Sequence, residues 1–202
     1  MSLRTTAASI ALALALGACS LGGMLGGGKA PTTLMVLTPE APDPGQIART
    51  AAPGQAVTIA VPHVSRELNN VRVPVQVNPV DVQYVTDLTL ADTPDRLFAG
   101  LLAETVRRTT NRVVVNPEQT GVDPGLTVTG VLQRFGYDAA TGQVIVQYDG
   151  SLAVPGGNRV ETRRFTASAP ADGTAATVGP ALNRAANQVA LDVAKWIGGS
   201  GS

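Results

Sequence analysis

Three strand-length segments follow one another in the second half of the chain, separated only by short turn-forming stretches. Residues 126–137 and 143–154 flank the loop 138–142, and residues 159–167 follow the turn-forming Pro-Gly-Gly-Asn at 155–158. Consecutive strands joined by so few residues pair with their neighbours in antiparallel fashion. We therefore expect an antiparallel meander here, which restricts the fold to those built on such a sheet.

A second β region precedes the meander. Valines alternate with polar residues or proline over residues 71–77, which is the period of a half-buried strand, and residues 82–90 follow an Asn-Pro turn. Pro74 has no N–H group, so we expect its strand to lie at a sheet edge or to be distorted there. An exposed edge on this strand would allow self-association, and a homo-oligomer is therefore possible. Shorter strands are predicted at 34–37, 57–61 and 112–115.

Two amphipathic helices are predicted. The first begins at Thr93-Pro94-Asp95, with a capping hydroxyl, a proline in the first turn and an acid near the positive end of the helix dipole. One face of it carries Leu97, Phe98, Leu101, Leu102 and Thr105. The second helix covers residues 181–197, and its buried stripe is Leu182, Ala186, Val189, Val193 and Trp196. We interpret Trp196 as a filler of the core.

These elements predict an α+β fold, with a mostly antiparallel sheet and two main helices packed on one face of it. Arg107, Arg108 and Arg112 fall near the end of the first helix, and we interpret them as a solvated helix end in preference to an anion site. Hydrophobic residues make up 44% of the chain, which is sufficient for a core. Lys+Arg and Asp+Glu both number 15, so no positive charge favours nucleic acid as a partner.

The N-terminus has the pattern of a secretory signal. Arg4 supplies a positive charge, residues 10–16 form an apolar run, and small residues follow. The run is too short to span a bilayer as a helix. Leu16-Gly17-Ala18-Cys19 resembles the bacterial lipobox, in which the cysteine thiol is lipidated and the chain is cut just before it. Two or three acyl chains such as palmitate give stable anchoring, because each buried CH₂ contributes about 0.8 kcal/mol.

The alternative is an ordinary signal peptide that is cut nearby, with an incidental cysteine. Ser20 stands after Cys19 where an aspartate would favour the inner membrane, so we expect an outer-membrane location facing the periplasm. The expected organisation is a signal peptide at 1–18, a lipidated cysteine and flexible linker at 19–31, a single α+β domain at 32–197 and a disordered tail at 198–202.

No catalytic motif is evident. His63 is the single histidine, and the sequence holds neither a nucleophile elbow nor a glycine-rich phosphate loop. One cysteine provides no internal disulfide and no cysteine-based metal cluster. Paired carboxylates stay open, because 15 acidic residues can meet in space. We expect a protein without enzymatic activity, cofactor or metal.

The order of parts resembles the ABC-type transport auxiliary lipoprotein family, the PqiC-like lipoproteins. After the lipobox, the segments that carry the resemblance are 34–39, 57–62, 81–102, 131–135 with its Leu-x-x-Phe pattern, and the Ala-rich helix 181–197. Members of the family often have a tryptophan signature where the β region meets the first helix. Residues 90–94 (Leu-Ala-Asp-Thr-Pro) lack it here, which removes any contact made through that aromatic.

The resemblance implies a non-catalytic periplasmic partner of an MCE-type ABC transporter, which moves phospholipid or related lipids between envelope membranes. The implied partners are the MCE-domain protein and the permease and ATPase of that complex, with the membrane reached through the lipid on Cys19. Two alternatives stay open. One is another outer-membrane assembly lipoprotein, which assists lipopolysaccharide export or a secretin. The other is a carrier that binds lipid in its own cavity.

Overall fold

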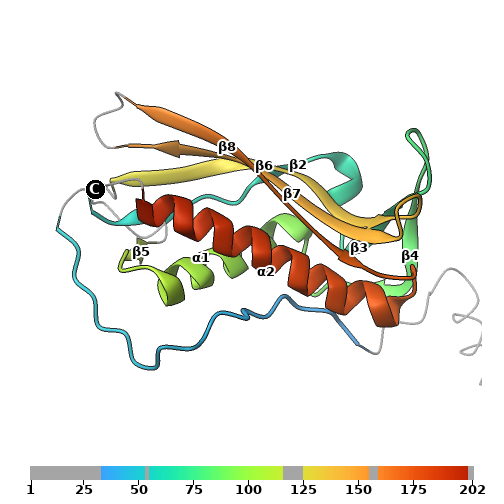
Figure 1. Cartoon of the computed structure of the whole chain (residues 1–202), viewed down its shortest axis with the longest axis horizontal. Helices are drawn as coiled ribbons and strands as arrows, with labels where there is room; N and C mark the ends of the chain where they lie inside the picture. The colour runs from blue at the N-terminus through green and yellow to red at the C-terminus, as the bar shows by residue number, and fades with distance from the viewer. Residues whose placement is uncertain (1–32, 53–54, 116–124, 155–158, 200–202) are drawn as a thin grey trace, which may run out of the picture. The chain divides into compact units, whose positions relative to one another are not determined.

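The computed structural model describes residues 33–52, 55–115, 125–154 and 159–199. One sheet forms a layer, and both long helices, α1 (Pro94–Thr109) and α2 (Ala175–Gly199), lie on the same face of it (Figure 1). An extended segment near the N-terminal end of the described chain crosses the outer side of the helices (Figure 1). The α+β fold with a mostly antiparallel sheet and two helices on one face is confirmed.

The sheet is organised around its longest strand. The strands are β1 (Val57–Ile59), β2 (His63–Val64), β3 (Arg72–Gln76), β4 (Val82–Thr89), β5 (Val114–Val115), β6 (Leu126–Asp138), β7 (Gln143–Ala153) and β8 (Val160–Pro170), with a 3₁₀ turn η1 (Arg66–Leu68) after β2. β7 pairs along one side of β6, and β1, β2 and β3 pair in succession along its other side. The strands β4, β3, β6, β1 and β5 are hydrogen-bonded in that order. β7 pairs with the other side of β6, and β8 pairs with β7.

The predicted meander β6-β7-β8 is confirmed. Both of its ladders are antiparallel and long. The Asp138 carboxylate closes the first hairpin by accepting from the N–H groups of Ala140 and Thr141, both at 3.1 Å. Arg134 donates to the same carboxylate at 2.7 Å, and this hydrogen bond is the main reason why the pKa of Asp138 is lowered.

Four strand pairings within the described residues are parallel, and none of them was predicted from the sequence. They place β3 between β4 and β6, so the expected edge position of the strand 71–77 is wrong, together with its exposed edge for self-association. The expected distortion is present, because the register shifts between Arg72 and Pro74. The β3 and β6 backbones approach closely here: a Cβ on Gly136 would lie 2.3 Å from the Pro74 carbonyl oxygen.

Three of the predicted short strands are shorter than expected. The segment 34–37 makes a single parallel bridge, in which Met35 N–H donates to the Thr89 carbonyl and the Met35 carbonyl accepts from Ala91, both at 2.8 Å. β1 ends at Ile59 and β5 covers only two residues. The segment at Met35 is paired at a single residue, whereas β1 pairs along its length with β6 and over two residues with β5.

α1 begins where the sequence predicts it. Thr93 is its N-cap and Pro94 its first residue, but the Thr93 side chain makes no capping hydrogen bond. The predicted face is buried except for Leu97, which is half-buried.

α2 begins earlier than predicted, at Ala175, and contains Pro180 in its second turn. Asp172 holds the start of this helix by accepting from the Thr174 N–H at 2.9 Å and from the Thr177 hydroxyl. These contacts, and the burial of Val178, offset the hydrogen bond that the proline cannot make. The helix reaches Gly199, so two residues of the predicted tail are helical. Residues 200–202 lie outside the described residues.

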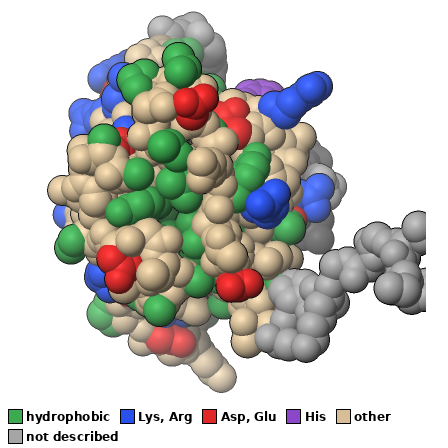
Figure 2. Space-filling model, turned by 90° about the vertical axis from the view of Figure 1, so that its right-hand side faces the viewer, with side chains coloured by type: hydrophobic (Ala, Val, Ile, Leu, Met, Phe, Trp, Pro, Cys, Tyr) green, Lys and Arg blue, Asp and Glu red, His purple; other side chains and the backbone are tan. Residues whose placement is uncertain are grey.

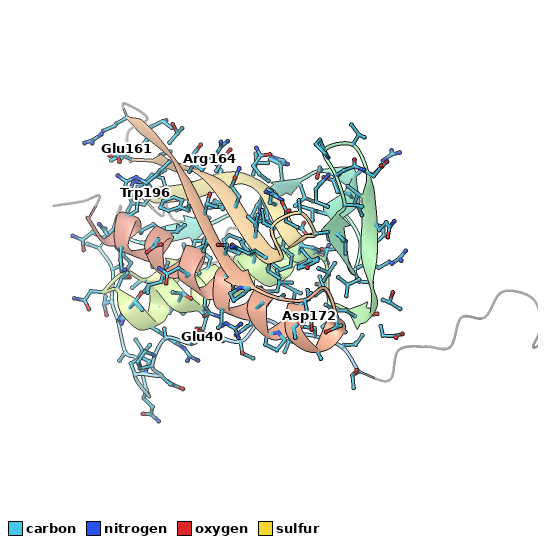
Figure 3. The ribbon with its side chains drawn as sticks, turned by 45° about the vertical axis from the view of Figure 1, so that its right-hand side comes forward. Glu40, Glu161, Arg164, Asp172 and Trp196 are labelled. Atoms are coloured by element: carbon cyan, nitrogen blue, oxygen red, sulfur yellow. The ribbon has the colours of Figure 1, made fainter. Side chains whose placement is uncertain are left out.

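The buried face of α2 packs on β7 and β8 through aromatic residues. The predicted stripe on α2 is fully or almost fully buried. Trp196 is 5% exposed, lies 5.4 Å from Phe165 and donates from Nε1 to Glu161 at 3.1 Å (Figure 3). Tyr148 is fully buried; its hydroxyl donates to the Thr129 carbonyl at 2.8 Å, and burial raises its pKa. Trp196 therefore fills the core, as predicted.

Candidate functional site

The predicted processing site, Leu16, Gly17, Ala18 and Cys19, lies outside the described residues. The described chain begins at Thr33, next to the bridge that ties Met35 to the end of β4. Across the described ranges, no helix combines the length and apolar character that a membrane crossing requires.

His63, the one histidine, is exposed at the start of β2. Within the described part of the chain, no group of three or more His, Cys, Asp or Glu side chains is placed to hold a metal ion. Four surfaces of the described chain are candidates for a functional role: the end of α1, the segment that crosses the helices, the open sheet face and the end that carries β4.

The arginines at the end of α1 are engaged inside the molecule. Arg107 and Arg108 donate to Glu104 at 3.0 and 2.7 Å, and the bond from Arg108 is the main cause of the lowered pKa of Glu104. Arg108 also donates to the Ala41 carbonyl at 2.9 Å, and its side chain is only 18% exposed. The expectation of a merely solvated helix end is therefore wrong for Arg108, because it binds the segment that crosses the helices.

That segment, residues 38–49, is here named the N-terminal strap. Thr38 N–H donates to the Asn183 side chain at 2.9 Å, and the Thr38 carbonyl accepts from Asn187 at 2.9 Å. Glu40 N–H donates to the Asn187 side-chain oxygen at 2.8 Å, and Figure 3 shows Glu40 on the helix side of the molecule. Two asparagines four residues apart on α2 thus bind the strap backbone as a neighbouring strand would.

The C-terminal end of the strap lies on the C-terminus of α1. Arg49 donates to the carbonyls of Arg107 at 2.7 Å and Arg112 at 3.3 Å. The last carbonyls of a helix have no partner inside the helix, so a guanidinium there is favourable. A groove of about 240 Å³ lies beside the strap and is lined by residues that include Glu40, Thr105 and Arg184.

Sequence reasoning missed the strap. The signal was present in Asn183 and Asn187, which stand four residues apart on the predicted final helix, close to its buried stripe. Asn187 is 6% exposed, and a buried amide requires hydrogen-bond partners. An asparagine among apolar residues of a buried stripe therefore indicates a polar segment packed against that helix.

The sheet face opposite the helices is polar. Along β7, buried side chains alternate with half-buried ones, and the half-buried set faces away from the helices. Arg164 of β8 forms two hydrogen bonds to Asp149 of β7, at 2.6 and 2.7 Å, and this contact is the main reason why the pKa of Asp149 is lowered. Figure 3 shows Arg164 on the side of the sheet away from Glu40. Arg164 and Asp149 thus neutralise each other on this face.

The end of the molecule that carries β4 is apolar. Nine large hydrophobic residues are exposed in the described part of the chain, and six of them lie on the hairpin β3-β4 or immediately beside it. The six are Leu34, Val36, Val71, Val77, Val80 and Val82. Figure 2 shows hydrophobic side chains gathered on this end, with both acidic and basic side chains spaced around them. Patches of this kind mark interaction surfaces.

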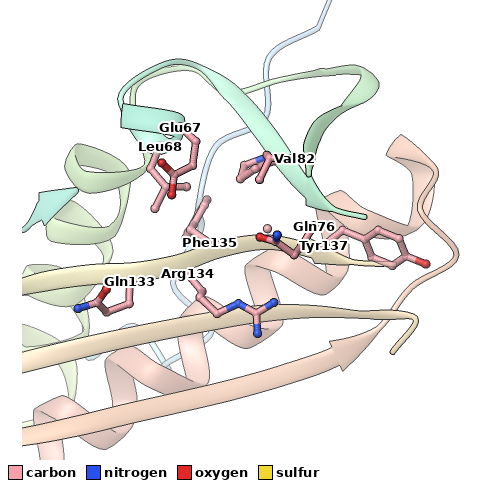
Figure 4. A pocket seen from close by; sticks show the side chains of 10 residues that line it. Glu67, Leu68, Gln76, Val82, Gln133, Arg134, Phe135 and Tyr137 are labelled. Carbon is pink, nitrogen blue, oxygen red and sulfur yellow. The ribbon is translucent and has the colours of Figure 1, made fainter. Parts of the chain in front are cut away.

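The tip of the hairpin is well fixed. Asn78 accepts from the N–H groups of Val80 and Asp81, both at 3.0 Å, and donates to the Asp81 carboxylate at 2.6 Å. Val80 is consequently held in solvent, where it is 86% exposed. Behind the hairpin lies a pocket of about 40 Å³, between Val82 and Leu68 on one side and Phe135 on β6 on the other (Figure 4). Its volume suits only a few water molecules.

Residues 36–194 match the family model of the ABC-type transport auxiliary lipoprotein component. The fold is similar to the crystal structure of a Xanthomonas campestris protein of the family model DUF330, with a TM-score of 0.67, 18% identity and coverage of 82% of this chain and 95% of that one. It is also similar to an uncharacterized protein, with a TM-score of 0.59, 15% identity and coverage of 74% and 96%. No curated protein matches the chain.

Proposed function

Because the chain belongs to the ABC-type transport auxiliary lipoprotein family, we propose that it is the lipid-anchored, non-catalytic accessory of an MCE-type ABC transporter that moves phospholipid or related lipids. The observation that carries the proposal is the family match, which covers residues 36–194. The lipobox-like segment that ends at Cys19 supports the anchor. In this role the protein binds other components of the complex and holds them at the membrane.

The surfaces of the molecule support docking over the carriage of cargo. The groove beside the strap has a volume of about 240 Å³, below the roughly 300 Å³ at which pockets for small molecules begin. The apolar end at β4, by contrast, is exposed and available to a protein partner.

The anchor is tested by Cys19→Ser. The variant cannot receive a thioether-linked lipid, so we expect it in the soluble or unprocessed fraction while the wild type sediments with membranes. Leu21→Ser beside it is the matched control and should stay anchored. A Cys19→Ser protein that is correctly cut, membrane-bound and active would refute the anchor.

The outer-membrane location is tested by Ser20→Asp. Where an aspartate after the cysteine retains lipoproteins in the inner membrane, the variant should move there and the wild type should fractionate with the outer membrane. If the wild type fractionates with the inner membrane, the proposed location is wrong, although the anchor itself is unaffected.

The partners are tested by affinity purification of the full chain from detergent-solubilised envelopes. We expect an MCE-domain protein with its permease and ATPase in the eluate, and a weaker yield with Cys19→Ser, because the unanchored domain is diluted. Recovery of a secretin or an outer-membrane β-barrel in their place would contradict the proposal and favour an assembly lipoprotein. Co-eluting lipid without these proteins would favour a carrier.

A further inference from the structure

Four strands have an open edge within the described ranges: β2, β4, β5 and β8. β2 and β5 have only two residues each. β8 carries Arg163 and Arg164 and ends at Pro170, and charges and proline are the means by which proteins protect an edge from unwanted pairing. Residues 82–86 of β4 contain no charged side chain and no proline. The edge of β4 is therefore the one that lacks such protection.

The hydrogen bonds of the hairpin show which backbone groups of β4 point outward. Val77 N–H donates to the Asp81 carbonyl at 3.0 Å, which makes this a hydrogen-bonded pair. Bonded and non-bonded pairs alternate in an antiparallel ladder. The pairs Gln76–Val82 and Pro74–Tyr84 are thus non-bonded, which agrees with the missing N–H of Pro74. The N–H and C=O groups of Val82 and Tyr84 consequently point to the open side.

Two acidic residues delimit this run. Asp81 and Asp87 are both exposed, one on each side of residues 82–86. Asp87 adopts φ 58°, a left-handed conformation that interrupts the regular strand. Near the other end of β4, the bridge of Met35 to Leu90 covers the edge. The open run is therefore about five residues long and has an acidic residue on each side. Its own side chains are uncharged, and the Arg72 guanidinium of β3 lies over the Tyr84 ring, 4.2 Å from its centroid.

We propose that the open edge of β4 binds one extended segment of a protein partner, with β-branched residues at its centre and a lysine or arginine at each end. The inference rests on the proposed function, in which the chain docks onto a transport component. The outward groups of Val82 and Tyr84 would bond the added strand, as in other cases of strand addition. Asp81 and Asp87 would pair with its basic ends, and Val80 and Val82 would cover its apolar side chains.

The alternative occupants of this edge fit less well. A hydrocarbon layer cannot satisfy the outward N–H and C=O groups, and it disfavours the two flanking carboxylates. A second copy of the chain, paired in the register centred on Tyr84, would place Asp81 directly opposite Asp87 of its neighbour. Like charges that face each other across a ladder are destabilising. A strand with a basic residue at each end satisfies the outward backbone groups and places opposite charges beside the two carboxylates.

The test uses the full chain in detergent and a capped heptapeptide, Lys-Val-Thr-Val-Thr-Val-Lys. We expect saturable binding, and at a peptide concentration ten times its Kd the amide exchange of Val82 and Tyr84 should slow about tenfold by mass action. The same peptide with glutamate at both ends should bind more weakly. The amides of β8 should be unaffected.

Two variants separate backbone pairing from charge. Val82→Pro removes one outward N–H at the first position of the strand, where proline is tolerated, and should abolish binding. The double variant Asp81→Asn with Asp87→Asn keeps residues that accept the left-handed conformation. It should lose the preference for lysine ends, with binding of the lysine peptide weakened about two- to fivefold per removed carboxylate. Circular dichroism and the exchange rates of β6 verify that both variants are folded.

Four outcomes would overturn the inference: no saturable binding of the lysine peptide, protection of β8 in place of β4, protection of β4 that rises with protein concentration alone, or protection by phosphatidylethanolamine–phosphatidylglycerol vesicles. The third would indicate a second copy and the fourth a lipid surface. Failure of the proposed function looks different: the chain would not co-purify with transport components, whatever the peptide does. If the Val82→Pro variant co-purifies with the transport components as well as the wild type does, the β4 edge is not the docking site.

Discussion

The Asn187 side chain donates a hydrogen bond to the Thr38 carbonyl at 2.9 Å, across 149 positions of sequence. The same amide accepts from Glu40 N–H at 2.8 Å, so a single residue of α2 bonds one acceptor and one donor of the strap backbone. An isolated extended segment has no neighbouring strand to bond. Asn187 of α2 supplies these hydrogen bonds from its side chain. The strap is thereby held against the outer side of the helices.

Asn187→Ala should release the strap. The free energy of unfolding is expected to fall by about 1–2 kcal/mol, because two backbone groups and the packing around a buried amide are lost. Denaturant titration measures this, and limited proteolysis should show new cleavage within residues 38–49. Gln188→Ala, at an exposed neighbouring position, should change stability by less than about 0.5 kcal/mol. Equal protease resistance of the Asn187→Ala variant and the wild type would show that the strap is held by other contacts.

Gly136→Ala should destabilise the sheet where β3 meets β6. A Cβ there would lie 2.3 Å from the Pro74 carbonyl oxygen, so the two strands must separate. The expected loss is about 1–3 kcal/mol, as for other overpacked positions. Gly100→Ala is the control: no atom lies within 4 Å of its Cβ position, and alanine in a helix should raise stability by about 1 kcal/mol. Thermal unfolding measures both variants: the melting temperature should fall for Gly136→Ala and rise for Gly100→Ala.

Tyr148→Phe should cost about 1 kcal/mol, because the Thr129 carbonyl loses the hydroxyl that donates to it at 2.8 Å. The ring itself stays, and so does its contact with Phe98, whose centroid lies 5.2 Å away. Tyr137→Phe at a half-buried position should change stability by less than about 0.5 kcal/mol. Urea unfolding measures both, and a Tyr148→Phe protein as stable as the wild type would mean that water replaces the hydroxyl.

Asp172 should make stability depend on acid pH. Hydrogen bonds from Thr177 and then Thr174 lower its pKa from 3.8 to about 2 in the folded protein. Because the folded pKa is the lower one, its contribution is fully present well above pH 3.8 and is lost as the pH falls through about 2. Carbon-13 NMR titration of the carboxyl group should give the low value. In Thr177→Val the pKa should move back towards 3.8, and an unchanged value would contradict this assignment.

The elements that the sequence predicts well are those with local signals. The meander β6-β7-β8 shows its alternation and its turns within a few residues, and the stripe of α2 repeats at helical spacing. The parallel pairing of Val57 with Leu126 joins distant residues and has no local signature. The order of strands follows from such pairings, so the open edge of β4 could not be foreseen. Pro74 illustrates this: proline predicts an edge or a distortion, and only the strand order decides between them.

The candidate functional residues also divide into those with a local sequence signal and those without one. Cys19 is predicted as a lipidation site because the lipobox is a short linear motif, which can be read from the sequence whatever the fold. The strap and the β4 edge depend on which surfaces the fold leaves open. Asn187 gave a partial clue, since an amide close to a buried stripe requires a partner. Its partner, Thr38, is an ordinary residue in a proline-rich stretch, and nothing in that stretch identifies it.

The strap also belongs to a stretch of chain that could extend under mechanical force. Residues 33–56 lie between the start of the described chain and β1, and fully extended they would span about 80 Å at 3.3–3.6 Å per residue. While Asn187 holds Thr38, that length is folded back along the helices. A pull on the N-terminus would reach the bridge of Met35 to the end of β4 first and the Asn187 bonds next. Both precede the central ladder, so a single-molecule force trace should show an early, low-force lengthening of up to about 80 Å. The sheet behind the strap would stay intact during this lengthening.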